Sequence, residues 1–95
     1  MSTLELNISG KVQKVGFRAC VKRIALSLSI VGTVRNLPDG RVHIIATGES
    51  ILLEKFISML YGCPRAVIRD IRVTRIDTRN FPEFSIAKIE RQESI

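Results

Sequence analysis

Residues 10–18 read Gly10-Lys11-Val12-Gln13-Lys14-Val15-Gly16-Phe17-Arg18, and this segment decides the fold. Before it, apolar and polar side chains alternate as in a half-buried strand, and after it apolar residues recur at helical spacing. A short loop that leads from a strand into a helix leaves several backbone N–H groups without partners at the positive end of the helix dipole. Anions bind at such a place, and Arg18 adds a planar cation that suits a phosphate. The segment therefore predicts a phosphate-binding loop.

The segments around this loop continue the strand and helix pattern. The expected elements are, in chain order, a strand around 4–8, a helix over about 18–29, strands over 30–35 and 41–47 joined by a turn at 36–40, a second helix with Ser50 as its N-cap and an end at 62–64, a strand over 68–77 and a short strand over 84–87. Because crossovers between parallel strands are right-handed, both helices should cover one face of an antiparallel sheet.

This order of elements predicts an α+β fold, the ferredoxin-like βαββαβ sandwich with a short C-terminal edge strand. The length of 95 residues suits one domain, which we expect to span residues 1–95. The polar tail at about residues 90–95 is expected to fray. The fold hosts binding modules as well as enzymes, so it does not decide the function.

Charge and composition narrow the choice of partners. The chain carries 15 Lys+Arg and 9 Asp+Glu, a formal net charge of +6, which favours either nucleic acid or a small phosphorylated ligand. Aromatic residues make up only 5%, fewer than a base-stacking surface usually has, so nucleic acid is not the expected partner. The sequence has neither an apolar run of membrane-spanning length nor a signal-peptide pattern, so we predict a cytoplasmic protein without membrane association.

The cysteines and the histidine carry little functional signal. Cys20 and Cys63 show no CxxC spacing, and with His43 as the single histidine they do not make a convincing zinc site, so no metal is expected. The default in a cytoplasmic chain is two free thiols. A disulfide stays open as an alternative, because the predicted topology brings both cysteines to one end of the molecule. His43 lies within a strand, where a structural role is expected.

Two polar residues far apart in the sequence are expected to meet at the loop. The first two strands run in the same direction. Arg18 follows the end of the first strand and Asn36 follows the end of the second, so both residues lie at the same end of the molecule. A carboxamide can both donate to and accept from a water, which suits the positioning of a nucleophile for phosphoryl transfer. The plainer alternatives are that Asn36 only begins a turn and that Arg18 is a surface residue, although a helix N-terminus disfavours a cation.

Two motifs resemble those of the acylphosphatase family. Residues 10–18 resemble its signature G-x-V-Q-G-V-G-F-R, and residues 32–42 resemble its second signature G-[aromatic]-V-x-N-x-x-D-G-x-V. Gly48, the turn at 62–64 and the segment at 84–86 match as well, so the resemblance covers nearly the whole chain. Two motifs of this length in the right order are far more specific than a lone glycine pattern.

The resemblance implies a small ferredoxin-like enzyme that hydrolyses the carboxyl–phosphate bond of acyl phosphates without a metal or other cofactor. Its partners would be a small-molecule acyl phosphate, with inorganic phosphate or sulfate as product or mimic, and we expect a monomer. By motif, Arg18 and the loop amides hold the phosphoryl oxygens, and Asn36 orients the attacking water. The implied phosphate-binding residues are Gln13, Lys14, Val15, Gly16, Phe17 and Arg18.

Three residues depart from the family pattern. Lys14 stands where glycine is usual, and if that position needs a positive φ the lysine costs roughly 1 kcal/mol or more. Ser29 replaces the usual glycine at the end of the first helix, and Thr33 replaces the usual aromatic residue. Two alternatives to the enzyme stay open. Lys14 suggests a phosphate-binding domain of the same family whose catalysis is impaired, and the net positive charge suggests a ferredoxin-like RNA-binding module.

Overall fold

The computed structural model describes residues 1–87, and the predicted fraying at about residues 90–95 lies outside the described residues. Seven elements follow one another along the chain: β1 Ser2–Lys11, α1 Phe17–Ser27, β2 Val31–Asn36, β3 Val42–Gly48, α2 Ser50–Leu60, β4 Val67–Ile76 and β5 Phe84–Ile86. Each predicted element is present, with bounds that differ from the expected ones by a few residues.

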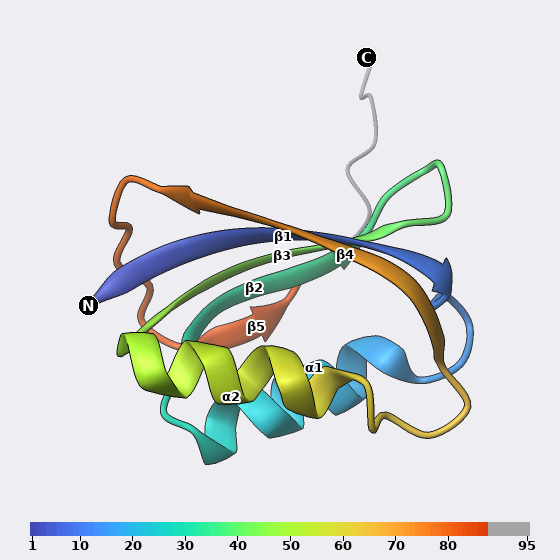
Figure 1. Cartoon of the computed structure of the whole chain (residues 1–95), viewed down its shortest axis with the longest axis horizontal. Helices are drawn as coiled ribbons and strands as arrows, with labels where there is room; N and C mark the ends of the chain where they lie inside the picture. The colour runs from blue at the N-terminus through green and yellow to red at the C-terminus, as the bar shows by residue number, and fades with distance from the viewer. Residues whose placement is uncertain (88–95) are drawn as a thin grey trace.

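The five strands form one sheet in the order β4-β1-β3-β2-β5. The β1 strand pairs antiparallel with both β3 and β4, β2 pairs antiparallel with β3, and the short β5 strand pairs parallel with β2. Figure 1 shows α1 and α2 lying together against one face of this sheet. The predicted ferredoxin-like α+β fold is confirmed.

The core lies between the helices and the sheet. Apolar residues alternate along the strands and recur along the helices, so each element turns one apolar side inward. The largest fully buried side chains are Phe17, Phe56, Phe84, Leu6, Ile8, Ile30, Ile44, Leu53 and Leu60. All seven residues of the central β3 strand are buried. None of the helices among residues 1–87 is long and apolar enough to cross a membrane.

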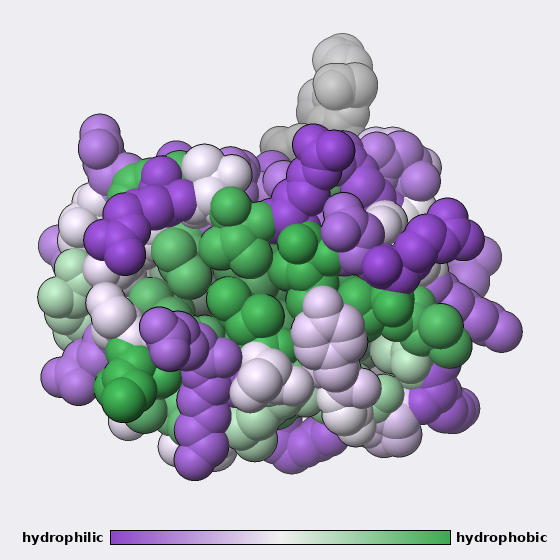
Figure 2. All heavy atoms as spheres, in the orientation of Figure 1, coloured by the Kyte–Doolittle hydropathy of each residue, from purple (hydrophilic) through white to green (hydrophobic). Residues whose placement is uncertain are grey.

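The edge strand β4 is much less covered than its neighbours. Only Ile68, Ile71 and Ile76 on this strand are even half-buried. Figure 2 shows apolar side chains gathered between β4 and α2. Val73 on β4 and Tyr61, the C-cap of α2, are exposed. A hollow of about 90 Å³ opens beside Leu4 and Ile57, at the start of β1 and α2.

The sheet has two distinct ends. We call the end where β1 and β2 finish and β3 begins the loop end, and the end where β1 begins and β3 finishes the far end. The β1 strand continues past the predicted bound to Lys11, through a bulge at Ser9 and Gly10. A Cβ atom at Gly10 would collide with the carbonyl oxygen of Val67 on β4, so this glycine serves the sheet and not the loop.

One predicted cap is wrong. The N-cap of α2 is Glu49, its side chain makes no capping hydrogen bond, and Ser50 is already the first helical residue. The Ser50 hydroxyl lies 3.4 Å from the Ser2 hydroxyl at the start of β1, so it is turned toward the sheet rather than toward the helix N-terminus. A sequence pattern marks a serine near a helix start but does not show which residue the helix begins with.

The default of two free thiols is also wrong, because Cys20 and Cys63 form a disulfide. Their Cα atoms lie 6.0 Å apart, and both side chains are buried. Cys20 belongs to the second turn of α1, whereas Cys63 follows the end of α2. Both positions lie at the loop end, as the topology predicted. The general rarity of disulfides in cytoplasmic chains favoured free thiols, and the structure overturns that expectation.

Candidate active site

The loop between β1 and α1 spans residues 12–16 and has an unusual backbone. Lys14 has φ +65° and Gly16 has φ +76°, both in the left-handed region. Gly16 is the N-cap of α1, where no side chain makes a capping bond and the first helical turn contains no acidic residue. The N–H groups of this turn and the positive end of the helix dipole therefore face the loop without a protein anion.

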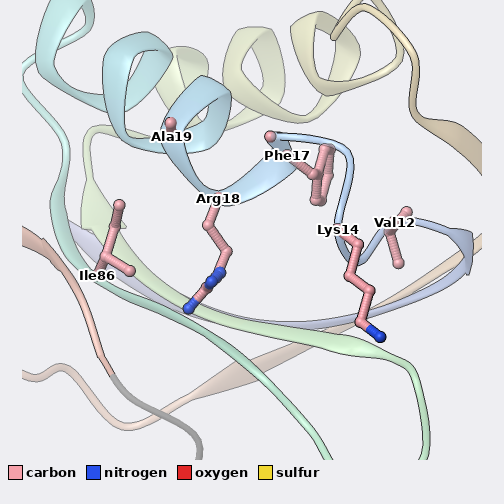
Figure 3. Close-up of a pocket in the computed structure, with 7 residues that line it drawn as sticks. Val12, Lys14, Phe17, Arg18, Ala19 and Ile86 are labelled. Atoms are coloured by element: carbon pink, nitrogen blue, oxygen red, sulfur yellow. The ribbon is translucent and has the colours of Figure 1, made fainter.

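Lys14 occupies the position where the family usually has glycine, and its backbone has the positive φ considered in the sequence. A non-glycine residue in this conformation costs about 1–2 kcal/mol. Its side chain is exposed, and Figure 3 shows it extending to the same side of the loop as Arg18. The lysine thus adds a second cation to the loop at a conformational cost.

The Gln13 side chain fixes the loop to the neighbouring turn. Its Nε2 donates to the carbonyl oxygens of Leu37 and Arg41, each at 2.9 Å. These two residues close the β2–β3 turn, where the Leu37 N–H donates to the Arg41 carbonyl at 2.8 Å. The Gln13 amide nitrogen is therefore used in positioning the loop, and only its backbone remains as a candidate ligand.

The Asp39 carboxyl in the same turn accepts two hydrogen bonds from Arg41. The Arg41 backbone N–H donates to Asp39 at 3.0 Å, and its Nε donates to the other carboxylate oxygen at 2.8 Å. These bonds, the backbone one first, hold the pKa of the Asp39 carboxyl below its ordinary value. The negative charge of Asp39 is thereby tied to Arg41 in the turn.

A cavity of about 190 Å³ opens beside the loop, and Arg18 and Lys14 are its charged lining residues. Figure 3 shows the Arg18 guanidinium entering it from α1, with Ile86 of β5 across from it. The lining residues are Val12, Lys14, Gly16, Phe17, Arg18, Ala19 and Ile86. Four of the six predicted phosphate-binding residues are thus brought together. Gln13, Val15 and the predicted water-orienting residue Asn36 do not line the cavity, and the Val15 side chain packs against the core instead.

Three lining residues were not predicted from the sequence. Val12 and Ala19 directly adjoin the predicted segment, and the spacing of apolar residues marked neither as part of a cavity wall. Ile86 reaches the cavity because β5 pairs in parallel with β2, which sets Ile86 opposite Val34. The pattern of a three-residue strand does not reveal which neighbour it joins, so no sequence signal could have placed Ile86 here.

Asn36 ends β2 with its side chain buried, at 8% exposure. Buried and half-buried residues alternate along β2, which places Asn36 on the same face as the core residue Val34, the face that α1 covers. Its Oδ1 has no hydrogen-bond partner among the described residues. A buried polar atom without a partner costs about 1–3 kcal/mol, and most such atoms in native proteins are satisfied. This oxygen is therefore available to a ligand or to a water.

His43 does not belong to the site. Its Nε2 lies 2.8 Å from the Glu5 carboxylate in the middle of the sheet, and it does not line the cavity. The base-stacking alternative also loses support, because Phe17, Phe56 and Phe84 are buried in the core and Tyr61 is the only exposed aromatic side chain among residues 1–87.

Comparison with known proteins identifies the family. The family model described as Acylphosphatase matches residues 4–86. An acylphosphatase of Archaeoglobus fulgidus is 46% identical over 88 residues, which cover 92% of this chain and 99% of that protein. The crystal structure of acylphosphatase from Bacillus subtilis, 34% identical, superposes with a TM-score of 0.83 over 92% of this chain and 99% of that one. An acylphosphatase structure from Coxiella burnetii, 29% identical, gives a TM-score of 0.86 and covers 90% and 92% of the two chains. The chain therefore belongs to the acylphosphatase family.

Proposed function

We propose that this acylphosphatase hydrolyses the carboxyl–phosphate bond of acyl phosphates in the cavity beside the loop. The backbone N–H groups of residues 13–18 and the Arg18 guanidinium hold the phosphoryl oxygens, and Asn36 orients the attacking water. The single observation that carries the proposal is the entry of Arg18 into a cavity at an uncapped helix N-terminus with no acidic residue in its first turn. Such a place stabilises an anion through fixed dipoles and a permanent charge.

In the proposed reaction, the water oxygen forms a bond to phosphorus while the bond from phosphorus to the acyl oxygen breaks. The carboxylate leaves with that electron pair, and both water protons remain on the released orthophosphate. A carboxylate is a stable anion, so its departure needs no protonation. The Asn36 Oδ1, buried and without a partner among residues 1–87, can accept a hydrogen bond from the water and orient its lone pair.

The stabilisation is chiefly electrostatic. Negative charge stays on the three phosphoryl oxygens throughout the transfer, and loop amides together with a guanidinium stabilise it without reorganising. Lys14 contributes a further positive charge at the cavity. Inorganic phosphate, the product, and sulfate, its mimic, should therefore bind competitively. The cytoplasmic location, the monomeric state and the single domain over residues 1–95 remain predictions.

One observation favours a second function. Lys14, where glycine is usual in the family, brings an ammonium group to the cavity, which favours a domain that binds and retains phosphate. Such a domain would bind phosphate without hydrolysing an acyl phosphate. The two functions differ in turnover and not in binding.

The test is hydrolysis of acetyl phosphate in ¹⁸O-labelled water containing EDTA. Attack at phosphorus places one labelled oxygen in the phosphate and none in the acetate, and turnover in the presence of EDTA supports the expected independence from metals. Label in the acetate would contradict the phosphoryl-transfer chemistry. Phosphate binding measured by calorimetry without any turnover would favour the binding domain.

A further inference from the structure

The loop lies between two turns that approach it from different sides. The β2–β3 turn contacts it at Gln13, through the two hydrogen bonds to Leu37 and Arg41. The turn between α2 and β4 approaches it at Gly16, with the Arg65 side chain beside that glycine. Figure 1 shows the loop at the same end of the molecule as both turns. In the sheet β2 and β4 lie on opposite sides of β1, the strand from which the loop begins.

Arg65 is held beside the loop by anchors on both sides of its turn. Two residues before it, Cys63 is joined to Cys20 of α1 by the disulfide. Two residues after it, Val67 pairs with Lys11, the last residue of β1. Arg65 itself has φ +69°, a conformation that an arginine rarely adopts. The turn is thus tied to the strand before the loop and to the helix after it.

The guanidinium of Arg65 lies close to the N-terminus of α1. Its Nη2 is 3.6 Å from the position that a Cβ atom would take on Gly16, the N-cap residue. Among residues 1–87 neither Arg65 nor Arg18 forms an ion pair. A cation at the positive end of a helix dipole is unfavourable unless an anion joins it. Arg65 is exposed and Arg18 is half-buried. Two arginines without an ion pair among residues 1–87 at one helix N-terminus therefore favour an anion there.

We propose that Arg65 binds the carboxylate that leaves phosphorus, an inference that rests on the proposed hydrolysis. In phosphoryl transfer the attacking and leaving oxygens lie roughly in line on opposite sides of phosphorus. With the water on the side of Asn36 and β2, the acyl oxygen leaves on the side of the α2–β4 turn. Arg65 does not line the cavity around Arg18. It lies beside Gly16 on the α2–β4 side of the loop, which is the side that this geometry gives to the leaving group.

The chemistry of the leaving group suits an arginine. As the phosphorus–oxygen bond breaks, negative charge develops on an oxygen that becomes half of a carboxylate. The planar guanidinium fork can donate two parallel hydrogen bonds to that carboxylate, and its charge does not depend on pH. Arg65 therefore stabilises charge that is small in the bound substrate and large in the transition state, which raises the rate rather than the affinity.

The test is a series of para-substituted benzoyl phosphates, from nitro to methoxy, with wild-type protein and Arg65→Gln. These substrates have the same shape at the acyl group, while the pKa of the leaving carboxylic acid rises along the series. With the methoxy compound, Arg65→Gln should lower kcat/KM roughly tenfold, because the variant loses hydrogen bonds to a charged group. The loss with the nitro compound should be clearly smaller, because its carboxylate needs less stabilisation. Arg65→Lys should recover part of the methoxy rate.

Arg72→Gln is the matched control. The Arg72 side chain on β4 is 81% exposed, and its substitution removes the same positive charge. Arg72→Gln should lower the rates only slightly, and by the same factor for every benzoyl phosphate in the series. An equal loss for all substrates in Arg65→Gln, or no loss, would overturn the role of Arg65 while leaving the hydrolysis intact. A wild-type protein that hydrolyses none of the substrates would overturn the proposed function itself. Circular dichroism checks that each variant is folded.

Discussion

The two ends of the sheet differ in whether a buried polar side chain has its hydrogen-bond partners. At the far end, Thr3 and Thr47 are buried and their hydroxyls lie 2.7 Å apart. The Arg79 N–H donates to the Thr3 hydroxyl at 2.9 Å, and the Thr47 hydroxyl donates to the Arg79 carbonyl at 2.8 Å. At the loop end, Asn36 is similarly buried, yet its Oδ1 has no partner among the described residues.

This difference separates a structural hydrogen-bond network from a binding site. The three far-end residues satisfy one another and connect the segment before β5 to the sheet. The loop end instead keeps an open acceptor, two cations at a cavity and an uncapped helix N-terminus. Groups of this kind lower stability when nothing binds them, so their presence at the same end of the sheet favours a ligand there.

Positive φ angles show the same contrast. Ser29 at the far end has φ +57° just after the C-cap of α1, where a left-handed residue is an ordinary way to finish a helix. Its N–H donates to the Leu26 carbonyl at 3.3 Å, and the next residue, Ile30, donates to Ala25 at 2.9 Å. Lys14 at the loop end has the same left-handed backbone conformation, but its loop precedes a helix and does not finish one.

The largest expected effect at the loop end is on catalysis by Arg18→Ala. Removing one preorganised donor to the developing charge lowers kcat by about 100- to 1,000-fold. The melting temperature should change little, because the guanidinium is not part of an ion pair among residues 1–87. The measurement is the rate of acetyl phosphate hydrolysis beside a thermal melt. A variant with wild-type kcat would remove Arg18 from the reaction.

Reduction of the disulfide should produce the next largest effect, on stability. The bridge closes a sequence separation of 43 residues, and disulfides typically contribute about 2–4 kcal/mol, so reduction should lower the melting temperature by roughly 10–20 °C. Thermal melts with and without dithiothreitol measure this. A Cys20→Ser, Cys63→Ser double variant is the control, and its melt should not respond to the reductant. Identical melts of the wild type would show that the bridge adds nothing to stability.

Lys14→Gly and Ser29→Gly form a matched pair at the two ends. Each substitution relieves about 1–2 kcal/mol of strain in the left-handed backbone. Each also makes the unfolded chain more flexible, which costs about 0.5–1 kcal/mol of stability. Both variants should therefore be as stable as the wild type or slightly more stable. Only Lys14→Gly should raise KM for an acyl phosphate, because only Lys14 lines the cavity. Urea unfolding and steady-state kinetics measure the pair. A clear loss of stability in Lys14→Gly would show that lysine suits its conformation.

The smallest expected effect concerns Asp39 in the turn beside the loop. Hydrogen bonds from Arg41 lower the pKa of this carboxyl in the folded state, so they stabilise the fold above its unfolded pKa. That contribution is lost as the pH falls through the lower, folded value. Asp39→Asn should therefore be slightly less stable than the wild type at neutral pH, with a difference that disappears in strong acid. Urea unfolding at several pH values checks this, and a difference that persists in strong acid would contradict it.

The sequence predicted most of the fold and most of the residues that line the cavity, for identifiable physical reasons. The change from alternating to helical spacing around residues 10–18 located β1, the loop and α1, and strand directions brought Arg18 and Asn36 to one end. The second helix cap was wrong because Ser50 interacts with Ser2 across the fold. The disulfide was only the alternative expectation, because general cysteine statistics, which favoured free thiols, ignore a specific 6.0 Å approach. Ile86 and Arg65 depend on strand pairing and turn packing, which local patterns do not encode.

The most direct test compares Asn36→Leu at the loop end with Thr47→Val at the far end, each measured for kcat and for melting temperature. If the open acceptor exists for the water, Asn36→Leu loses at least about 100-fold in kcat and melts at or above the wild-type temperature, because an unsatisfied group is removed. Thr47→Val should keep its kcat and lose about 1–3 kcal/mol of stability, because it leaves partners unsatisfied. An Asn36→Leu variant that hydrolyses acetyl phosphate at the wild-type rate would contradict the account.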